Sequence, residues 1–408
     1  PVASLPVYVV SHPDGVKHVL QDQHRRYSKN TVQYNALSAI TGKGLLTSDG
    51  PLWLRQRRLA QPAFARSRLM DLDRIIVPAA QAMLERWQEF ARKEIPVDVD
   101  AEMMRLTLEI VGKALFSIDL SREAGKLTGA VLTVLDHIVY RARNMIVPPD
   151  FVPTPRNLRF GSALRVLDET VYRLIQDRRR SDQPGDDLLG MLLKARDDET
   201  GEPMSGRQVR DEILTMLIAG HETVASALTW TWYLLSCHPQ ARDKMRSEVA
   251  GHLGSRLPDS TDLAALPYTA QVFSEALRLY PPAWVITRRA VEEDELMGYP
   301  VPAGALMIIS PYVVHRHPDF WQAPELFSPE RFEPEREGKR HRFAYIPFGG
   351  GPRLCIGSGF AAVEAHLIMA MITQQFWLEL APKTQVQVDA LVTLRPKEGL
   401  PMLVRPYH

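Results

Sequence analysis

The stretch over residues 348–357, with the sequence FGGGPRLCIG, constrains this chain more than any other. It places Cys355 in a glycine-rich loop that leads directly into an apolar run over residues 360–376, which we predict to be a helix. A sulfur near a helix N-terminus lies close to backbone N–H groups without helical partners and to the positive end of the helix dipole, and both favour a thiolate. The loop's glycines leave room for backbone or a flat ligand to approach that sulfur. A buried structural cysteine beside a tight turn is the alternative.

Length and composition are those of an ordinary globular protein. The chain has 408 residues, of which 45% are hydrophobic and 24% charged, and no linker-like or low-complexity stretch divides it. We therefore expect one large domain over residues 1–408. A net charge of +1 gives no argument for a nucleic-acid partner, and two cysteines are too few for a disulfide framework. The cysteine usage favours a reducing compartment, so the cytoplasm is the expected location.

An apolar segment over residues 207–237 is predicted to be a central helix with Ala219, Gly220, His221, Glu222 and Thr223 in its middle. Ionisable groups are costly in lipid, so a buried core helix is favoured over a transmembrane span. The Thr223 hydroxyl can bond to the carbonyl oxygen of Ala219, which together with Gly220 would open the helix locally. Glu222 then offers an ionisable group for a proton relay. A capped kink with a salt-bridged glutamate is the alternative.

Two further predicted helices each carry a pair of notable side chains on a shared face. Trp53 and Arg57 stand four residues apart, and an ordinary amphipathic helix explains them equally well. Glu275 and Arg278 stand three apart among leucines, which indicates a buried setting where a charge pair needs further partners.

Histidines give no zinc site in the sequence. His221 has alanine rather than a possible ligand four residues on, and His315 and His317 precede a proline in a predicted turn. Neither arrangement has the ligand spacing of a zinc site.

The pattern Phe-x-x-Gly-x-Arg-x-Cys-x-Gly is complete over residues 348–357 and resembles the haem-binding loop of the cytochrome P-450 family. The resemblance implies that Cys355 is the metal ligand, binding the iron of haem b as a thiolate. It also implies that Phe348, Gly349, Arg353 and Gly357 belong to the cofactor-binding loop.

Other segments are similar to further motifs of that family, in the family's order. Ala219, Gly220, Glu222 and Thr223 match its oxygen-activation motif and are the implied catalytic residues. Trp53 and Arg57 match a helix that holds a haem propionate, and Arg288 stands where a second propionate partner is expected. Glu275 and Arg278, with Arg331, match a buried charge triad behind the haem loop, to which we assign a structural role.

The implied fold is mainly α-helical with small β-sheets, with haem between the central oxygen-activation helix and the helix that follows the cysteine loop. The expected domain is a single cytochrome P-450 catalytic domain over residues 1–408. Members of the family normally carry a further N-terminal segment, so a native segment before Pro1 is compatible with this sequence. No membrane segment is visible in the sequence itself.

The implied activity is that of a haem-thiolate monooxygenase, which hydroxylates a hydrophobic small molecule with dioxygen. Because no flavin- or nicotinamide-binding region is apparent, a separate ferredoxin or flavoprotein is expected to supply the electrons. An apolar pocket, and hence a lipid, terpenoid or carotenoid-like substrate, is predicted from Leu45, Leu46, Ala283, Trp284, Val285 and Leu394. The alternatives are a peroxygenase of the same fold that uses hydrogen peroxide, a haem-binding protein without turnover, and a purely structural helical protein.

Overall fold

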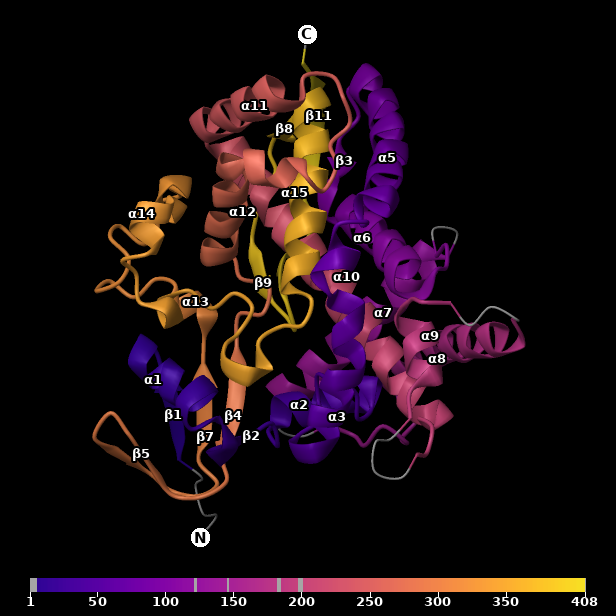
Figure 1. Cartoon of the computed structure of the whole chain (residues 1–408), viewed down its shortest axis with the longest axis vertical. Coiled ribbons are helices and arrows are strands. Elements are labelled where there is room, and N and C mark those ends of the chain that lie inside the picture. Colours follow the sequence, from indigo (N-terminus) through magenta and orange to yellow (C-terminus); the bar gives the residue numbers. More distant parts are fainter. Residues whose placement is uncertain (1–5, 121–122, 145–146, 182–184, 197–200, 408) are drawn as a thin grey trace. The chain divides into compact units, whose positions relative to one another are not determined.

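The computed structural model describes residues 6–120, 123–144, 147–181, 185–196 and 201–407. It is mostly helical with small β-sheets, which confirms the predicted fold class (Figure 1). The chain groups into two compact units. The first consists of Pro1–Ser28, Arg66–Leu106 and Thr223–His408, and the second consists of Lys29–Ala65 and Thr107–Glu222. The single catalytic domain expected from the sequence stays a prediction.

Two long helices contribute residues to both units, α6 (Val99–Phe116) and α10 (Gly206–Cys237). The bounds of α10 confirm the predicted central helix. No helix among the described residues combines the length and the apolar character needed to cross a membrane.

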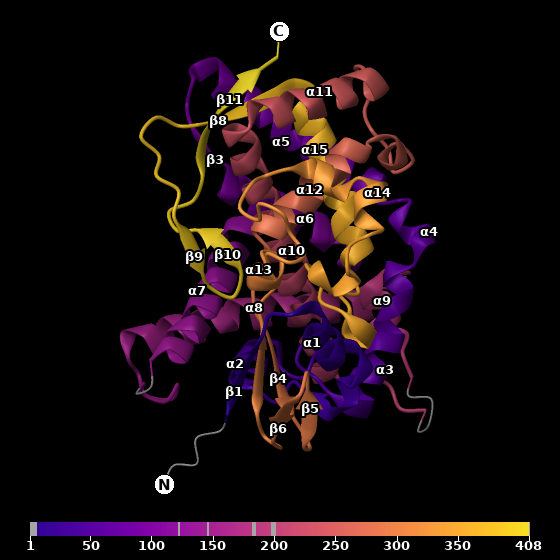
Figure 2. The ribbon, with the colours of Figure 1, turned by 90° about the vertical axis from the view of Figure 1, so that its left-hand side faces the viewer.

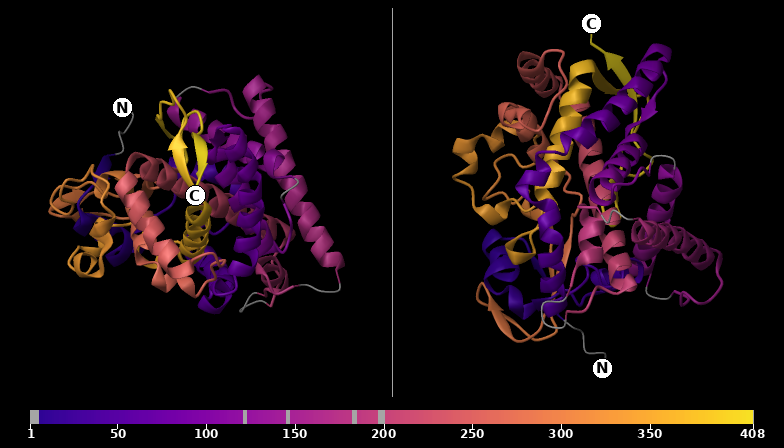
Figure 3. Two further views of the ribbon diagram at one scale, coloured as in Figure 1. Left: turned by 90° about the horizontal axis from the view of Figure 1, so that it is seen from above. Right: turned by 45° about the vertical axis from the view of Figure 1, so that its right-hand side comes forward.

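The first unit contains the helix that follows the cysteine loop. This helix, α15, packs against α5, α11 and α12 (Figures 1 and 3). The α-helices that lie within this unit are α1 (Pro13–Lys17), α4 (Arg66–Leu69), α5 (Asp73–Lys93), α11 (Pro239–Leu253), α12 (Pro267–Leu279), α13 (Pro311–Val314), α14 (Pro334–Glu337) and α15 (Ser358–Gln375). Short turns of other helix types are η1 (His18–Asp22), η2 (His24–Arg26), η4 (Asp262–Ala265), η5 (Pro329–Phe332), η6 (Arg342–Ala344) and η7 (Gly351–Arg353).

Helix α15 is apolar on every side because the helices around it bury it. Its second half is almost fully excluded from solvent, from Leu367 to Ile372. A helix in such surroundings needs no polar stripe, so the sequence shows a continuous apolar run rather than a helical period.

All strands of the described residues lie in the first unit, in small sheets (Figure 2). The largest has the order β1-β7-β4-β2, in which β1 is parallel to β7 and the other pairs are antiparallel. A second has the antiparallel order β3-β11-β8, and β5-β6 and β9-β10 form hairpins. The strands are β1 (Val7–Val10), β2 (Tyr27–Ser28), β3 (Val97–Asp98), β4 (Ile286–Ala290), β5 (Asp294–Leu296), β6 (Tyr299–Val301), β7 (Leu306–Ile309), β8 (Phe376–Leu380), β9 (Val388–Ala390), β10 (Leu394–Pro396) and β11 (Pro401–Pro406).

The second unit is helical in its described residues. Its helices are α2 (Val32–Thr41), α3 (Gly50–Ala60), η3 (Gln61–Phe64), α7 (Ala124–Arg143), α8 (Pro155–Arg180) and α9 (Leu188–Lys194). Helices α7 and α8 pack along one another, and α2 packs against α7. Thr154 caps the N-terminus of α8, where its side chain accepts a hydrogen bond from the amide of Asn157.

Candidate active site

The cysteine loop is closed by a hydrogen bond between its two ends. The amide of Cys355 donates to the carbonyl oxygen of Phe348 at 3.0 Å, and the amide of Gly349 donates to that of Ile346, also at 3.0 Å. The chain enters α15 at Ser358, with Gly357 as the N-cap residue. The thiol of Cys355 is exposed. The loop thus presents the sulfur shortly before a helix N-terminus, as the sequence predicts.

Glycine is required at different positions of this loop for different structural reasons. A β-carbon at Gly350 would lie 2.7 Å from the Phe343 ring, and one at Gly351 would overlap the Leu20 carbonyl oxygen. Both positions therefore serve close packing of the loop against protein, not approach of a ligand. Gly349 has a φ of +75°, and a β-carbon there would meet only Ile286, at 3.9 Å. At this position a left-handed backbone conformation, with open space beside it, explains the glycine.

The predicted charge triad comes together in the first unit, behind the segment that leads to the cysteine loop. Arg278 donates from Nε and Nη2 to the two carboxylate oxygens of Glu275, at 2.6 and 2.7 Å. The Nε of Arg331 lies 3.4 Å from the Glu275 carboxylate. Glu275 and Arg278 are completely buried. The pair is tolerated there because backbone groups bond to its remaining polar atoms: the amide of Ser328 donates to Glu275.

The residues that resemble the family's oxygen-activation motif lie in an unbroken helix. Helical structure continues through residues 219–223 of α10, which shows no interruption at the turn where the sequence predicts a local opening. Gly220 has a packing role, because a β-carbon there would lie 3.1 Å from Val111 of α6. The hydroxyl of Thr107, also on α6, donates to the carbonyl oxygen of His221 at 3.0 Å. Glu222 is buried and Thr223 partly exposed.

Trp53 and Arg57 lie half-buried on α3 in the second unit, one helical turn apart. Leu45 and Leu46 belong to the same unit, in the segment before α3. The amide of Leu45 donates to Glu212 of α10 at 3.1 Å. Burial raises the pKa of Glu212 to about 7, against the ordinary value of 4.5.

The remaining predicted pocket residues lie in the first unit. Ala283, Trp284 and Val285 precede β4 rather than forming its start, because the strand begins at Ile286. The indole Nε1 of Trp284 donates to the Leu391 carbonyl oxygen at 2.9 Å, which fixes the ring. Ala283 is exposed, and Val285 is half-buried.

Leu394 begins β10 and is held to α10. Its carbonyl oxygen accepts from the Ser226 hydroxyl at 2.5 Å and from the Trp230 indole at 3.0 Å. The sequence suggests a hairpin between residues 390–394 and 400–404, and this prediction is wrong. Residues 388–390 pair with 394–396, while 401–406 pair with β8 and β3. Both segments have strand-like sequences, and long-range pairing decides their partners.

Arg288 and Arg353 are the cations of the first unit that the sequence assigns to the cofactor. Arg288 is buried in β4, 6% exposed, and its Nη1 donates to the Thr287 carbonyl oxygen at 2.8 Å. Arg353 is half-buried in η7, two residues before Cys355.

Sequence reasoning assigned no role to several buried titratable side chains of the first unit, among them His315 and Glu364. His315 bonds to backbone groups through both ring nitrogens, and burial lowers its pKa to about 3. Glu364 of α15 is completely buried, and neither of its carboxylate oxygens has a hydrogen-bond partner among the described residues. Burial raises the pKa of Glu364 well above its ordinary value. A glutamate inside an otherwise apolar helical run was the one signal that could have found the second residue.

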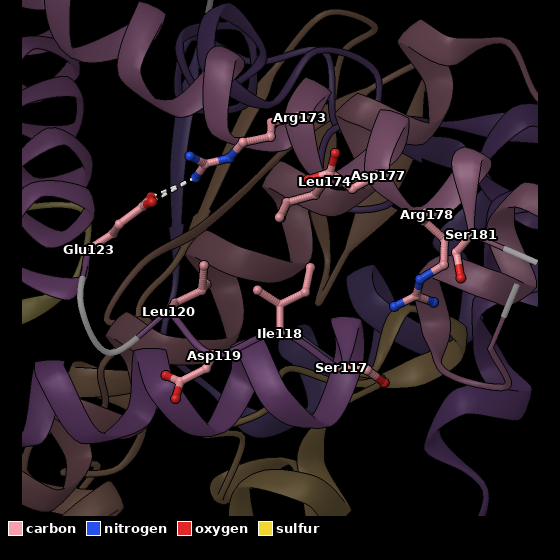
Figure 4. A pocket seen from close by; sticks show the side chains of 10 residues that line it. All are labelled: Ser117, Ile118, Asp119, Leu120, Glu123, Arg173, Leu174, Asp177, Arg178 and Ser181. Atoms are coloured by element: carbon pink, nitrogen blue, oxygen red, sulfur yellow. Dashed lines mark hydrogen bonds and ion pairs between the residues drawn. The ribbon is translucent and has the colours of Figure 1, made fainter. Parts of the chain in front are cut away.

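A cavity of about 350 Å³ is lined by residues of the second unit, and none of these lining residues is one that the sequence assigns to the site (Figure 4). Its charged groups already have protein partners. Arg173 bonds to both carboxylate oxygens of Glu123, at 2.7 and 2.8 Å, and Arg178 bonds to both of Asp187. The lining therefore offers no unpaired arginine to a ligand.

An exposed thiol presented just before a helix N-terminus is an arrangement in which a cysteine can bind haem iron as a thiolate. The chain belongs to the cytochrome P-450 family: residues 2–400 match the family model described as "Cytochrome P450". It is accordingly a cytochrome P-450 monooxygenase, and the cofactor of this family is haem b ligated by a cysteine.

Named relatives and a solved structure support this assignment. The chain is 40% identical to cyclooctatin synthase of Streptomyces melanosporofaciens over 94% of this chain and 83% of the relative. It is 35% identical to pentalenene oxygenase of Streptomyces avermitilis over 95% of this chain and 85% of the relative. The crystal structure of the haem domain of cytochrome P450DA superposes with a TM-score of 0.88 at 28% identity, covering 98% of this chain and 88% of that one.

The residues of the first unit fit this cofactor. Cys355 would supply the soft sulfur ligand, and Gly349 leaves open space on the loop beside it. Arg288 would supply a buried guanidinium, which suits the carboxylates at the rim of a porphyrin.

Replacing Glu364 with glutamine tests the buried carboxyl through the pH dependence of stability. The native pKa is raised, so the native protein keeps a proton that the unfolded chain releases above about pH 4.5. The stability contributed by this proton is present below that pH and is lost as the pH rises toward the native pKa. The Glu364→Gln protein lacks this loss. Its free energy of unfolding relative to the wild type should rise by up to about 1.4 kcal/mol per pH unit between pH 5 and the native pKa.

Denaturant titrations of both holoproteins at several pH values measure this difference. Desolvation lowers the pKa of the partly buried His366 to about 4, but this side chain titrates alike in the two proteins, so its effect cancels. Parallel pH profiles would show that the Glu364 carboxyl is ionised in the native protein.

Proposed function

We propose that this chain hydroxylates a hydrophobic terpenoid, using dioxygen and electrons from a separate ferredoxin or flavoprotein. The observation that carries the proposal is the closed loop that presents Cys355 at the start of α15. The substrate class is supported by the relatives, because cyclooctatin synthase and pentalenene oxygenase are monooxygenase relatives with terpenoid substrates. Use of a small-molecule substrate, dioxygen and a redox partner follows from the family.

In this proposal Cys355 binds the iron of haem b as its thiolate. The helix N-terminus and the exposure of the sulfur both favour loss of its proton. When bound, the haem supplies the activation of dioxygen that inserts one oxygen atom into a C–H bond and releases the other as water. Arg288, Arg353 and Arg57 would pair with the propionates of the bound haem, and Trp53 lies one helical turn from Arg57 on α3. Phe348, Gly349 and Gly357 shape the loop.

Glu222 and Thr223 deliver protons in this proposal. They are consecutive residues of α10, so their side chains leave the helix about 100° apart. Glu222 is buried, which lets its carboxyl hold and release a proton within the protein, and the Thr223 hydroxyl passes the proton on. Ala219 and Gly220 keep the adjacent turn free of bulky side chains.

The substrate pocket is proposed to take its apolar surface from Leu45, Leu46, Ala283, Trp284, Val285 and Leu394. Two of these residues are fixed in place: the Trp284 ring by its bond to Leu391, and the Leu394 backbone by Ser226 and Trp230. A fixed apolar surface binds a rigid hydrocarbon skeleton at little cost in conformational entropy. Glu275, Arg278 and Arg331 keep the structural role assigned to them.

We further propose that residues 1–408 act as one catalytic domain, and that the protein works in the cytoplasm. The match of the family over residues 2–400 supports the first statement. The presence of only Cys237 and Cys355 as cysteines supports the second, because it fits a reducing compartment.

The proton-delivery role is tested with Thr223→Ala and Glu222→Gln in the holoenzyme, supplied with a surrogate ferredoxin, its reductase and a terpene hydrocarbon. We expect hydroxylated product to form about 10²-fold more slowly in each variant, because a positioned proton donor is lost. Electrons consumed should then appear as hydrogen peroxide. With hydrogen peroxide replacing dioxygen and electrons, the variants should match the wild type, because peroxide brings both protons itself.

Thr231→Ala is the matched control. Thr231 lies two turns further along α10, is completely buried, and donates to the carbonyl four residues back, at Ala227, at 2.7 Å. It should leave the rate with dioxygen unchanged.

Oxygen-18 from labelled dioxygen should appear in the wild-type product. A wild type that works only with hydrogen peroxide would establish the peroxygenase instead, and one that forms no product from either oxidant would favour a haem-binding protein without turnover.

A further inference from the structure

His315 occupies a buried position between three segments of the first unit. It follows α13, and it has no exposed surface. Its Nε2 accepts a hydrogen bond from the amide of Ile346 at 2.8 Å, and its Nδ1 lies 3.2 Å from the carbonyl oxygen of Arg278. An amide can only donate and a carbonyl can only accept, so the ring carries its proton on Nδ1 and is neutral. Both ring nitrogens are used by backbone.

The backbone of His315 returns the contact to Arg278. The guanidinium Nη1 of Arg278 donates to the carbonyl oxygen of His315 at 3.1 Å. Arg278 and His315 therefore exchange two hydrogen bonds, one through each side chain. The buried pair of Glu275 and Arg278 is thereby joined to an imidazole whose other side holds Ile346.

Ile346 lies two residues before Phe348, at the entrance of the cysteine loop. Its carbonyl oxygen accepts from the amide of Gly349, and the carbonyl oxygen of Phe348 accepts from the amide of Cys355. A continuous chain of hydrogen bonds and short backbone steps thus leads from the His315 ring to the cysteine. The two residues before Ile346 are held differently: Trp321 donates to the carbonyl of Ala344 at 3.2 Å, and the Tyr345 hydroxyl donates to that of Ser274 at 2.9 Å.

We propose that His315 is a positioning residue that sets the conformation of the cysteine loop, and through it keeps Cys355 in the geometry that binds iron as a thiolate. This inference rests on the proposed role of Cys355. Without the imidazole, the amide of Ile346 would be buried with no acceptor, and the loop would gain conformations in which the sulfur is displaced. Among the hydrogen bonds from Trp321 to Ala344, from Tyr345 to Ser274 and from Ile346 to His315, the last stands nearest to Phe348 in the chain.

The selective test is His315→Asn. The asparagine amide can reach the carbonyl of Arg278 from the position of Nδ1, but it is too short to reach the amide of Ile346. His315→Gln is the restoring variant, because its longer amide offers a neutral donor and a neutral acceptor. Trp321→Phe is the control, because it removes the neighbouring bond to Ala344 but leaves Ile346 held.

The readouts are the optical spectrum of the reduced carbon monoxide complex and the rate of haem loss to an excess of apomyoglobin. For His315→Asn we expect part of the thiolate-type band to be replaced by the band of a thiol-ligated complex. We also expect haem loss to be about tenfold faster, the factor for one buried hydrogen bond. His315→Gln and Trp321→Phe should keep the thiolate-type band, although Trp321→Phe lowers the melting temperature.

An undiminished thiolate-type band with unchanged haem loss in His315→Asn would overturn the inference. If that variant does not accumulate as holoprotein, His315→Phe decides, because it keeps a ring of similar size but offers no acceptor to the Ile346 amide: a thiol-type band supports the role, and an undiminished thiolate-type band overturns it. A wild type without any thiolate-type band would instead overturn the proposed role of Cys355.

Discussion

Cys355→Ser is expected to remove the thiolate-type carbon monoxide band completely and to abolish hydroxylation. A serine hydroxyl keeps its proton at neutral pH and is a hard, weakly donating ligand, whereas a thiolate is soft and donates electron density to iron. The substitution removes little volume, and the loop is closed through backbone atoms, by the amide of residue 355 and the carbonyl of Phe348. The fold should therefore survive, so the change reports the ligand and not the structure.

Cys237→Ser provides the matched control for this experiment. Cys237 ends α10, is exposed, and undergoes the same atomic substitution as Cys355. It should leave the spectrum, the haem content and the turnover rate of the wild type unchanged. The assigned ligand would be contradicted if the carbon monoxide complex of the wild type showed the band of a histidine-ligated haem. It would also be contradicted if a thiolate-type band persisted after Cys355→Ser.

The parts of the fold that the sequence predicted are those governed by local pattern. The apolar run after Gly357 became α15, and the apolar segment around His221 became α10. The i, i+3 spacing of Glu275 and Arg278 placed both charges on one helix face, and leucines beside them indicated burial. Each of these inferences depends on residues within a few turns of one another.

What the sequence did not predict depends on contacts between distant segments. The glycines at 350 and 351 are required by Phe343 and Leu20, which no spacing within the loop could indicate. The pairing of residues 388–390 with 394–396 was missed because a strand-like sequence does not indicate which other strand it pairs with.

His315 stands out in the sequence only as a possible metal ligand. Its structural partners are backbone groups 37 and 31 residues away, at Arg278 and Ile346. Every residue type except proline has the same backbone donor and acceptor groups. A residue pattern therefore does not distinguish a histidine that bonds to backbone from any other histidine. The same holds for Leu394, which is held through its carbonyl oxygen.

Glu275→Gln is expected to cause a large loss of stability, about 3–5 kcal/mol in the free energy of unfolding. Glutamine fills the same space but leaves the guanidinium of Arg278 charged, fully buried and without its counter-charge. Arg331, whose Nε lies 3.4 Å from the same carboxylate, loses its partner as well. Denaturant unfolding of the holoprotein, with haem absorbance and far-ultraviolet circular dichroism as probes, measures the loss.

Glu89→Gln is the control for this substitution. Glu89 pairs with Lys93 four residues on in α5, at 2.5 Å, but both side chains are more than half exposed, at 63% and 58%. Solvent screens that pair, so its loss should not measurably change stability. Equal effects of the two substitutions would mean that burial of Glu275 and Arg278 does not determine the strength of their interaction.

The double variant Glu275→Leu/Arg278→Leu distinguishes the contribution of the ion pair from that of the hydrogen bonds that Arg278 donates to backbone. Replacing a buried ion pair with apolar residues is often neutral, because both desolvated charges disappear together. Here Arg278 uses all of its N–H groups, donating also to the carbonyl oxygens of His315, Pro324 and Leu326. Those carbonyls would be left buried without donors. We therefore expect the double variant to remain as unstable as Glu275→Gln, because the guanidinium also organises the backbone that leads to the cysteine loop.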